Sequence, residues 1–151
     1  MRLELTVQYA TARKGLPHKS SIERWARAAL ADLGRGGAAL TVRIVGARES
    51  AALNGRYRGK QGPTNVLAFP FSAPPGAKSD VLGDIVICAP VVRREARAQG
   101  KRVPAHWAHL TVHGIMHLRG YDHRTRRQAA AMEGREVRVL ARLGFPDPYL
   151  V

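Results

Sequence analysis

Cysteine is almost absent from this chain of 151 residues, which contains only Cys88. A single cysteine excludes an intramolecular disulfide and is typical of a protein in a reducing compartment. Cys88 directly follows three apolar residues, Ile85–Ile87. We therefore expect a buried, inert thiol and not a metal ligand.

Long apolar runs are also missing. No stretch of the sequence approaches the ~20 apolar residues that a membrane-spanning helix needs. Glu4 interrupts the apolar segment that a secretory signal would require near the start of the sequence. We expect a cytoplasmic protein that has no membrane partner.

Acidic residues are scarce: 11 Asp and Glu stand against 25 Lys and Arg, of which 20 are Arg, and the net charge is +14. The planar guanidinium fork suits phosphate groups, so this excess favours a polyanion such as nucleic acid as the partner. A general bias toward arginine would explain arginine in place of lysine, but not so large a net charge.

The segment Asn54–Asn65 is rich in glycine and basic residues and carries one aromatic residue, Tyr57. A loop of this composition is compatible with phosphate binding and equally with an ordinary solvated turn. It lacks the spacing of a P-loop, so we expect no nucleotide cofactor.

The hydropathy pattern predicts a single domain over 1–151 with strands early and helices late. Strands are predicted at 3–7, 40–44, 66–71 and 82–88, and helices at 20–33, near 51–53, at 90–99, 104–117 and 126–143. This order of elements predicts the α+β class.

The sequence also predicts a cap for the first helix and a buried face for the last one. Ser20 and Glu23 have the spacing of a capping box at the start of the first helix. In the last helix the candidate core residues are Ala130, Val137, Leu140 and Ala141.

The stretch from His113 to His123 contains three histidines with suggestive spacing. His113 and His117 are four residues apart, so they share one face of a helix, and Gly120 allows the chain to turn back and bring His123 toward them. Three imidazoles without an evident fourth protein ligand are typical of a catalytic zinc-type site with an open position. The alternative is that surface or core histidines merely cluster here.

His109 also lies on this face, but it is eight residues from His117, or ~12 Å along a helix axis. Zinc ligands in a tetrahedral site lie within ~3.5 Å of one another. We therefore expect His109 to support a ligand and not to bind the metal, and we place His106 at the surface or in the packing.

The motif resembles the metzincin pattern His-Glu-x-x-His-x-x-Gly-x-x-His, except that Gly114 replaces the glutamate that acts as general base in those proteases. Without that carboxylate, peptide hydrolysis lacks its usual proton acceptor. The pattern argues against a peptidase.

The full stretch, His-Gly-x-x-His-Leu-x-Gly-Tyr-Asp-His, resembles the signature of the YbeY family of bacterial rRNA maturation factors, which are single-strand-specific, metal-dependent endoribonucleases. Three further segments are similar to segments of that family in order and spacing: Leu53–Lys60, Pro63–Pro70 and Gly83–Ile85. The chain departs from the family at Asn65 and Ala68, and it carries arginines after His123 where the family is usually acidic.

The resemblance implies a zincin-like α+β fold with a four-stranded mixed sheet and about five helices. It also implies one zinc ion bound by His113, His117 and His123, and it matches Arg58 to a functionally important arginine. The implied role is processing of ribosomal RNA, notably the 3′ end of 16S rRNA, and ribosome quality control. The implied partners are single-stranded RNA and the small ribosomal subunit or its assembly factors.

The predicted mechanism is metal-assisted phosphodiester hydrolysis with His113 and Arg58 as the catalytic residues. Arg58 would bind the scissile phosphate, and the nucleophile would be water or the 2′-OH. Further substrate contacts are predicted at Lys60, Arg93, Arg97 and Arg124, and Asp122 is predicted to orient a ligand imidazole or to serve only as a turn carboxylate.

The sequence also allows two other functions. The first is a non-catalytic RNA- or ribosome-binding assembly factor in which the zinc is structural. The second, which Gly114 disfavours, is a zincin-type peptidase.

Overall fold

The computed structural model describes residues 1–150 and contains one four-stranded sheet and five helices. The elements in chain order are β1 (Arg2–Ala10), α1 (Lys19–Ala29), β2 (Gly37–Val45), α2 (Ala47–Arg58), β3 (Val66–Pro70), β4 (Val81–Cys88), α3 (Ala89–Ala98), α4 (Val103–Leu118) and α5 (Arg126–Arg142). The sheet order is β1-β2-β4-β3; β1, β2 and β4 run parallel, whereas β3 pairs antiparallel with β4 at the edge. The predicted α+β class, the mixed four-stranded sheet and the number of helices are confirmed.

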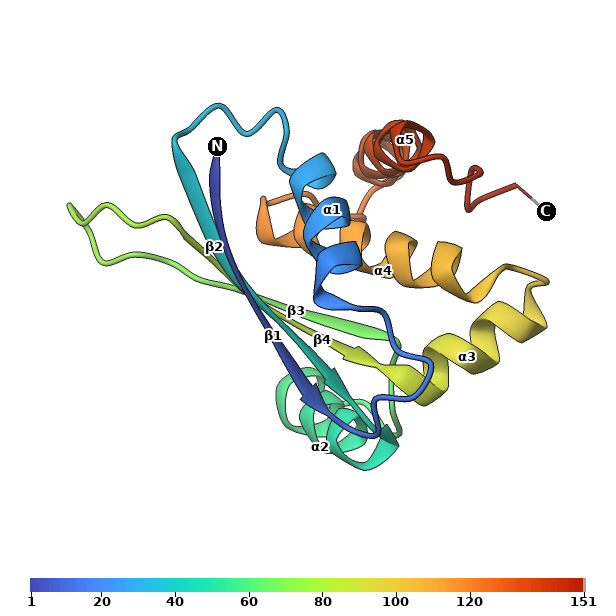
Figure 1. Cartoon of the computed structure of the whole chain (residues 1–151). Helices are drawn as coiled ribbons and strands as arrows, with labels where there is room; N and C mark the ends of the chain where they lie inside the picture. Colours follow the sequence, from blue (N-terminus) through green and yellow to red (C-terminus); the bar gives the residue numbers. More distant parts are fainter. Residues whose placement is uncertain (151) are drawn as a thin grey trace.

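Helices cover both faces of the sheet (Figure 1). Val42, Ile44, Ile85 and Ile87 are completely buried in the main core, which also contains residues of α1, α4 and α5. The neighbouring positions of β2 and β4 point to the opposite face, where they form a second core: Val45, Val86 and Cys88, with Leu53 of α2 packed against them. Cys88 is a buried free thiol, as predicted.

Helix α4 is the element around which the main core is built. It contacts α1, α3, α5, β3 and β4. It lies so close to β4 that a Cβ atom on Gly114 would come within 2.9 Å of Cγ2 of Ile85. The glycine that replaces the metzincin glutamate therefore has a packing role, because a larger side chain would meet the sheet.

Two helix boundaries differ from the sequence prediction. α2 extends to Arg58, so Tyr57 and Arg58 lie on its last turn and not in a loop. α1 begins at Lys19 after His18, whose side chain makes no capping hydrogen bond, so the predicted capping box at Ser20 is wrong. A capping box occurs instead at α5, between Thr125 and Gln128.

The buried face of α5 was also predicted only in part. Leu140 is buried, but Ala130 and Ala141 are exposed and Val137 is half-buried. The buried residues are Met132, Glu136, Val139 and Leu140, which form one helical stripe. The prediction failed because a glutamate was not expected within that stripe.

Within residues 1–150 no helix combines the length and the apolar character needed to cross a membrane.

Gly83 is the position at which the backbone tolerates no side chain. Its φ angle of +138° is unfavourable for other residues, and a Cβ atom there would overlap the backbone carbonyl oxygen of Phe69 on β3. We predict that Gly83→Ala lowers the free energy of unfolding by about 3 kcal/mol or more, through backbone strain and a clash that cannot relax. Chemical denaturation measures this change.

Gly36→Ala is the matched control, since a Cβ atom at Gly36 would meet no heavy atom within 4 Å and the φ angle there is not positive. Its effect should stay within about 0.5 kcal/mol. Equal stability of the two variants would contradict the proposed close contact between β3 and β4.

Candidate functional site

The histidine cluster is built by the end of α4 and the turn that follows it. His113 and His117 lie on the last turns of the helix, which ends at Leu118. Gly120 has a φ of +97°, and the backbone N–H groups of Gly120 and Tyr121 donate to the carbonyl oxygens of His117 and Met116. This is a Schellman-type helix end, and it reverses the chain so that His123 returns toward the helix.

The three predicted imidazoles come together. The ring centres of His113 and His117 are 4.7 Å apart, those of His117 and His123 are 5.1 Å apart, and those of His113 and His123 are 6.0 Å apart. Three imidazoles on one tetrahedral ion with bonds of ~2.1 Å would have their ring centres about 5 Å apart. The arrangement therefore suits a shared metal ion.

Burial and the neighbouring His113 and His123 rings lower the pKa of His117. The lowered pKa favours the neutral imidazole, which is the form that binds metals.

A small cavity of about 150 Å³ opens at the histidines and brings in residues from two other elements. Arg58 from the end of α2 lines this metal-site cavity, together with Val66 and Ala68 of β3 and the preceding Asn65. Arg58, predicted from the sequence as a phosphate-binding residue, thus lies at the same cavity as His113, His117 and His123.

The segment after α2 is held in place by hydrogen bonds from the helix. The side-chain amide of Asn54 donates to the carbonyl oxygen of Gly62 at 2.9 Å. The Ser50 hydroxyl donates to the carbonyl oxygen of Thr64 and accepts from its N–H, both at 3.0 Å. Asn65 donates to Glu95 of α3 at 3.0 Å. These contacts position Arg58 and Asn65 at the cavity.

The other predicted substrate contacts lie outside this cavity. Lys60, Arg93 and Arg97 are exposed and do not line it. Arg124 is also exposed and pairs with Asp122 at 3.1 Å. Substrate binding by these four residues therefore stays a prediction.

The functional residue that the sequence analysis missed is Glu136 of α5. Its side chain is completely buried. One carboxylate oxygen accepts from Nδ1 of His113 at 2.8 Å, and the other accepts from Nε2 of His109 at 2.9 Å and from the Tyr149 hydroxyl. The signal in the sequence is a single glutamate within the apolar stripe of α5.

Burial alone would raise the pKa of Glu136, but hydrogen bonds from His109, His113 and Tyr149 hold it at about 2. The carboxylate is therefore ionised at neutral pH and acts only as an acceptor. Since Nδ1 of His113 donates to it, Nε2 of that ring keeps a free lone pair. A carboxylate behind a histidine is a common way to orient a metal ligand.

Two groups of side chains within residues 1–150 have ligand atoms close enough to hold a metal ion. The buried group consists of His109, His113 and Glu136. Its contacts of 2.8–2.9 Å have hydrogen-bond length, whereas two ligand atoms on one tetrahedral zinc lie ~3.4 Å apart.

The second group is more exposed and consists of His117, Asp122 and His123. Asp122 Oδ1 accepts from the backbone N–H of His123 at 2.7 Å and lies 3.6 Å from its ring nitrogen Nδ1. That hydrogen bond, with burial opposing it and Arg124 adding to it, lowers the pKa of Asp122. Asp122 thus both supports the turn and lies next to a candidate ligand, and its predicted role is still open.

Comparisons with known proteins identify the family of this chain. The model of the family described as "Endoribonuclease YbeY" matches residues 8–144. Two relatives of that name, from Alkalilimnicola ehrlichii and Methylococcus capsulatus, are 58% and 52% identical; each match covers 97% of this chain, and 91% and 95% of the respective relative.

A solved solution structure of a protein from Thermotoga maritima has the same fold, with a TM-score of 0.60 and 22% identity over 97% of this chain and 99% of that one. At this identity the likeness concerns the fold alone. The extent of the family match and the identity to both relatives show that the chain belongs to the endoribonuclease YbeY family.

Proposed function

We propose that this protein is a metal-dependent endoribonuclease that cuts single-stranded RNA. The observation that carries the proposal is the metal-site cavity, where Arg58 lies with three convergent imidazoles. The names of the relatives support the same activity. The biological substrate we propose is ribosomal RNA, notably the 3′ end of 16S rRNA, on the small ribosomal subunit or with its assembly factors.

His113, His117 and His123 are the residues that would hold one zinc ion. The spacing of their rings supports this set, and the hydrogen bond from His113 to Glu136 leaves Nε2 of His113 available as a ligand. When bound, such an ion would polarise the phosphate and activate a nucleophile at neutral pH. Other first-row ions also suit three imidazoles.

Arg58 would bind the phosphate that is cut. Its guanidinium can donate two parallel hydrogen bonds to phosphate oxygens and offset the negative charge that develops on them in the transition state. The side chain lies on the last turn of α2, beside the edge strand β3, so a single strand can reach it from solvent. This placement supports the proposal that Arg58 binds the substrate and takes part in catalysis.

Gly114 disfavours peptidase activity on structural grounds. A glutamate at this position would have to displace Ile85 of β4, because even a Cβ atom comes within 2.9 Å of that side chain. Among the described residues, the cavity lining itself contains no carboxylate, and the nearby Asp122 accepts from the backbone N–H of His123 and pairs with Arg124. A phosphodiester needs less help with the leaving group than an amide when a metal and an arginine are present.

The central prediction concerns His113 and the metal. We expect purified protein to contain about one zinc per chain and to cut single-stranded but not double-stranded RNA. His113→Ala and chelator-treated protein should lose at least about 100-fold in cleavage rate, because each removes the ion. Elemental analysis and a gel-based cleavage assay measure both quantities.

Re-addition of zinc should restore the chelated wild type but not His113→Ala. Full activity of the variant would contradict the proposal and indicate a contaminating nuclease. Bound metal without turnover on any RNA would favour the assembly-factor alternative.

The prediction for Arg58 separates the effect of its positive charge from the effect of the planar guanidinium, which can donate two parallel hydrogen bonds. Arg58→Ala should lower kcat by about 100-fold, as expected for loss of a group that stabilises transition-state charge. Arg58→Lys should recover only part of that loss, because an ammonium cannot bind phosphate in a bidentate way. Steady-state kinetics on a short fluorescent RNA measure the difference.

Arg56→Ala is the matched control, since Arg56 lies on the same exposed turn of α2 but does not line the cavity. If Arg56→Ala and Arg58→Ala reduce activity equally, the role of Arg58 is nonspecific attraction of RNA.

Glu136 is predicted to act through His113. Glu136→Gln should weaken zinc binding by about 10- to 100-fold, because the amide no longer accepts from both histidines as a charged group does. Tyr149→Phe should have a smaller effect, since both histidine contacts remain. Competition with a fluorescent zinc chelator measures affinity, and thermal unfolding of the metal-free proteins reports any separate loss of stability.

Glu133→Gln, one turn earlier on α5, controls for loss of a negative charge on this helix. Unchanged zinc affinity in Glu136→Gln would show that the buried carboxylate does not orient a ligand.

A further inference from the structure

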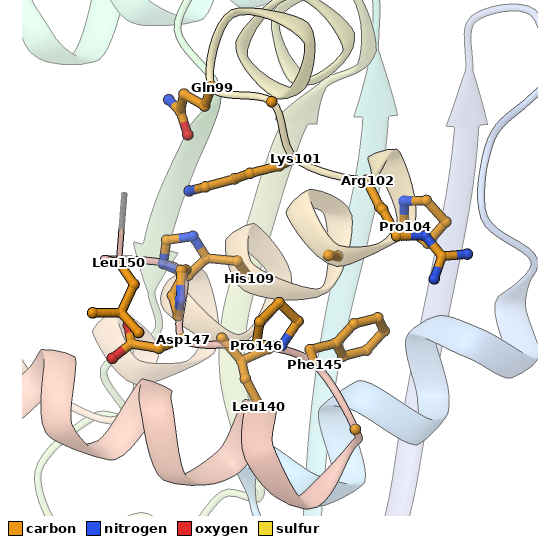
Figure 2. A pocket seen from close by; sticks show the side chains of 14 residues that line it. Gln99, Lys101, Arg102, Pro104, His109, Leu140, Phe145, Pro146, Asp147 and Leu150 are labelled. Atoms are coloured by element: carbon orange, nitrogen blue, oxygen red, sulfur yellow. The ribbon is translucent and has the colours of Figure 1, made fainter.

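A second, roomier cavity lies away from the histidine cluster. Its volume is about 480 Å³, which is within the range of small-molecule and nucleotide pockets. It is enclosed by the loop between α3 and α4, the first turn of α4, and the end of α5 with the residues that follow it. We call it the tail cavity, and Figure 2 shows its lining.

One side of the tail cavity is apolar and the other is basic. Leu140, Phe145 and Pro146 form a wall on one side, whereas Lys101 extends along the other with the His109 ring between them (Figure 2). Arg102 also lines the cavity, but its guanidinium points away from the Lys101 ammonium (Figure 2), and Asp147 is the one carboxylate of the lining. An apolar wall facing a cation suits a ligand with a flat apolar part and a negative charge.

Lys101 is the group in this cavity that most requires a partner. Burial lowers its pKa, against the opposing effects of Glu95 and Asp147. The residue is half-buried, and within residues 1–150 its ammonium makes no ion pair, although Glu95 and Asp147 act on its charge from nearby. A phosphate placed here would form a charge-assisted hydrogen bond with the ammonium.

His109 offers a second point of recognition. Its Nε2 lies 2.9 Å from the ionised carboxylate of Glu136 and donates to it, so Nδ1 is left as an acceptor. Nδ1 is buried and has no hydrogen-bond partner among the described residues. The exocyclic amine or ring N–H of a nucleobase is a donor that would satisfy it.

The tail cavity and the metal-site cavity lie along the same face of α4, since His109 lines the first and His113 and His117 line the second. A third pocket lies between them; it shares Lys101 and His109 with the tail cavity and Asn65 with the metal-site cavity. From Ala105, at the tail cavity, to His117, at the metal site, α4 rises ~18 Å. A single strand of a few nucleotides spans this distance, as in other single-strand binding grooves.

We propose that the tail cavity binds a nucleotide of the RNA substrate several positions away from the bond that is cut, with the base against Leu140, Phe145 and Pro146 and a phosphate on Lys101. The proposal rests on the proposed endoribonuclease function. It extends the substrate site from the scissile phosphate to a flanking nucleotide, so the enzyme would read a stretch of single strand and not one bond.

The test compares two RNA lengths in full-length, metal-loaded protein. One RNA reaches only the metal-site cavity, at about three nucleotides, and the other extends about eight nucleotides to either side of the cut site. Lys101→Glu reverses the charge, and Ala105→Trp fills the cavity from the first turn of α4. Lys19→Glu is the matched charge control, since Lys19 is exposed at the start of α1 and does not line any of the three pockets.

We expect Lys101→Glu and Ala105→Trp to raise the ratio of KM for the long RNA to KM for the short RNA by about tenfold. Lys19→Glu should leave that ratio unchanged. Fluorescence anisotropy of the labelled long RNA in the presence of chelator, where no cleavage occurs, should show the same order of affinities. Thermal unfolding shows whether the Ala105→Trp variant is folded. If it is not, the KM ratio of Lys101→Glu alone tests the proposal.

An unchanged ratio in Lys101→Glu, or an equal change in Lys19→Glu, would overturn the proposal. Failure of the proposed function gives a different result: wild-type protein would cut neither RNA in any metal. The anisotropy measurement would still show whether Lys101→Glu weakens binding of the long RNA.

Discussion

A buried carboxylate that receives three hydrogen bonds links the two helices on which the site depends. Glu136 of α5 accepts from His109 and His113 of α4 and from Tyr149 in the chain after α5. A buried charge without such partners would cost several kcal/mol, so α5 and the following segment must dock in one arrangement. The same contact fixes the ring of His113 and leaves its other nitrogen free. Stability of the fold and readiness of the site therefore depend on one interaction.

The close approach of α4 to the sheet is the second constraint. Gly114 allows the helix to lie against Ile85, which brings His113 and His117 beside β3 and within reach of Arg58 at the end of α2. Gly114, which stands where metzincin proteases have their catalytic glutamate, is thus also the residue that allows α4 to pack closely against β4. The cavity therefore presents histidines and an arginine, a combination suited to phosphate.

The sequence predicted those parts of the structure that depend on local spacing. The strand and helix order, the buried Cys88 and the approach of His123 to His113 and His117 follow from periodicity and from the turn at Gly120. Glu136 was missed because its partners lie 23 and 27 residues away, and no local pattern marks such a pair. The capping box at Ser20 was wrong because the N-cap of α1 is His18, two residues earlier, and the end of α2 was misplaced because glycines suggested a loop. The tail cavity depends on contacts among α3, α4 and the chain after α5, which only the folded structure reveals.

The location of the metal ion tests this account most directly. We predict that anomalous diffraction from zinc-loaded crystals gives one peak among His113, His117 and His123, at ~2.1 Å from a nitrogen of each, with Glu136 hydrogen-bonded to His113. A peak bound by His109, His113 and Glu136 would contradict it, because the carboxylate would then be a ligand and not the group that orients one.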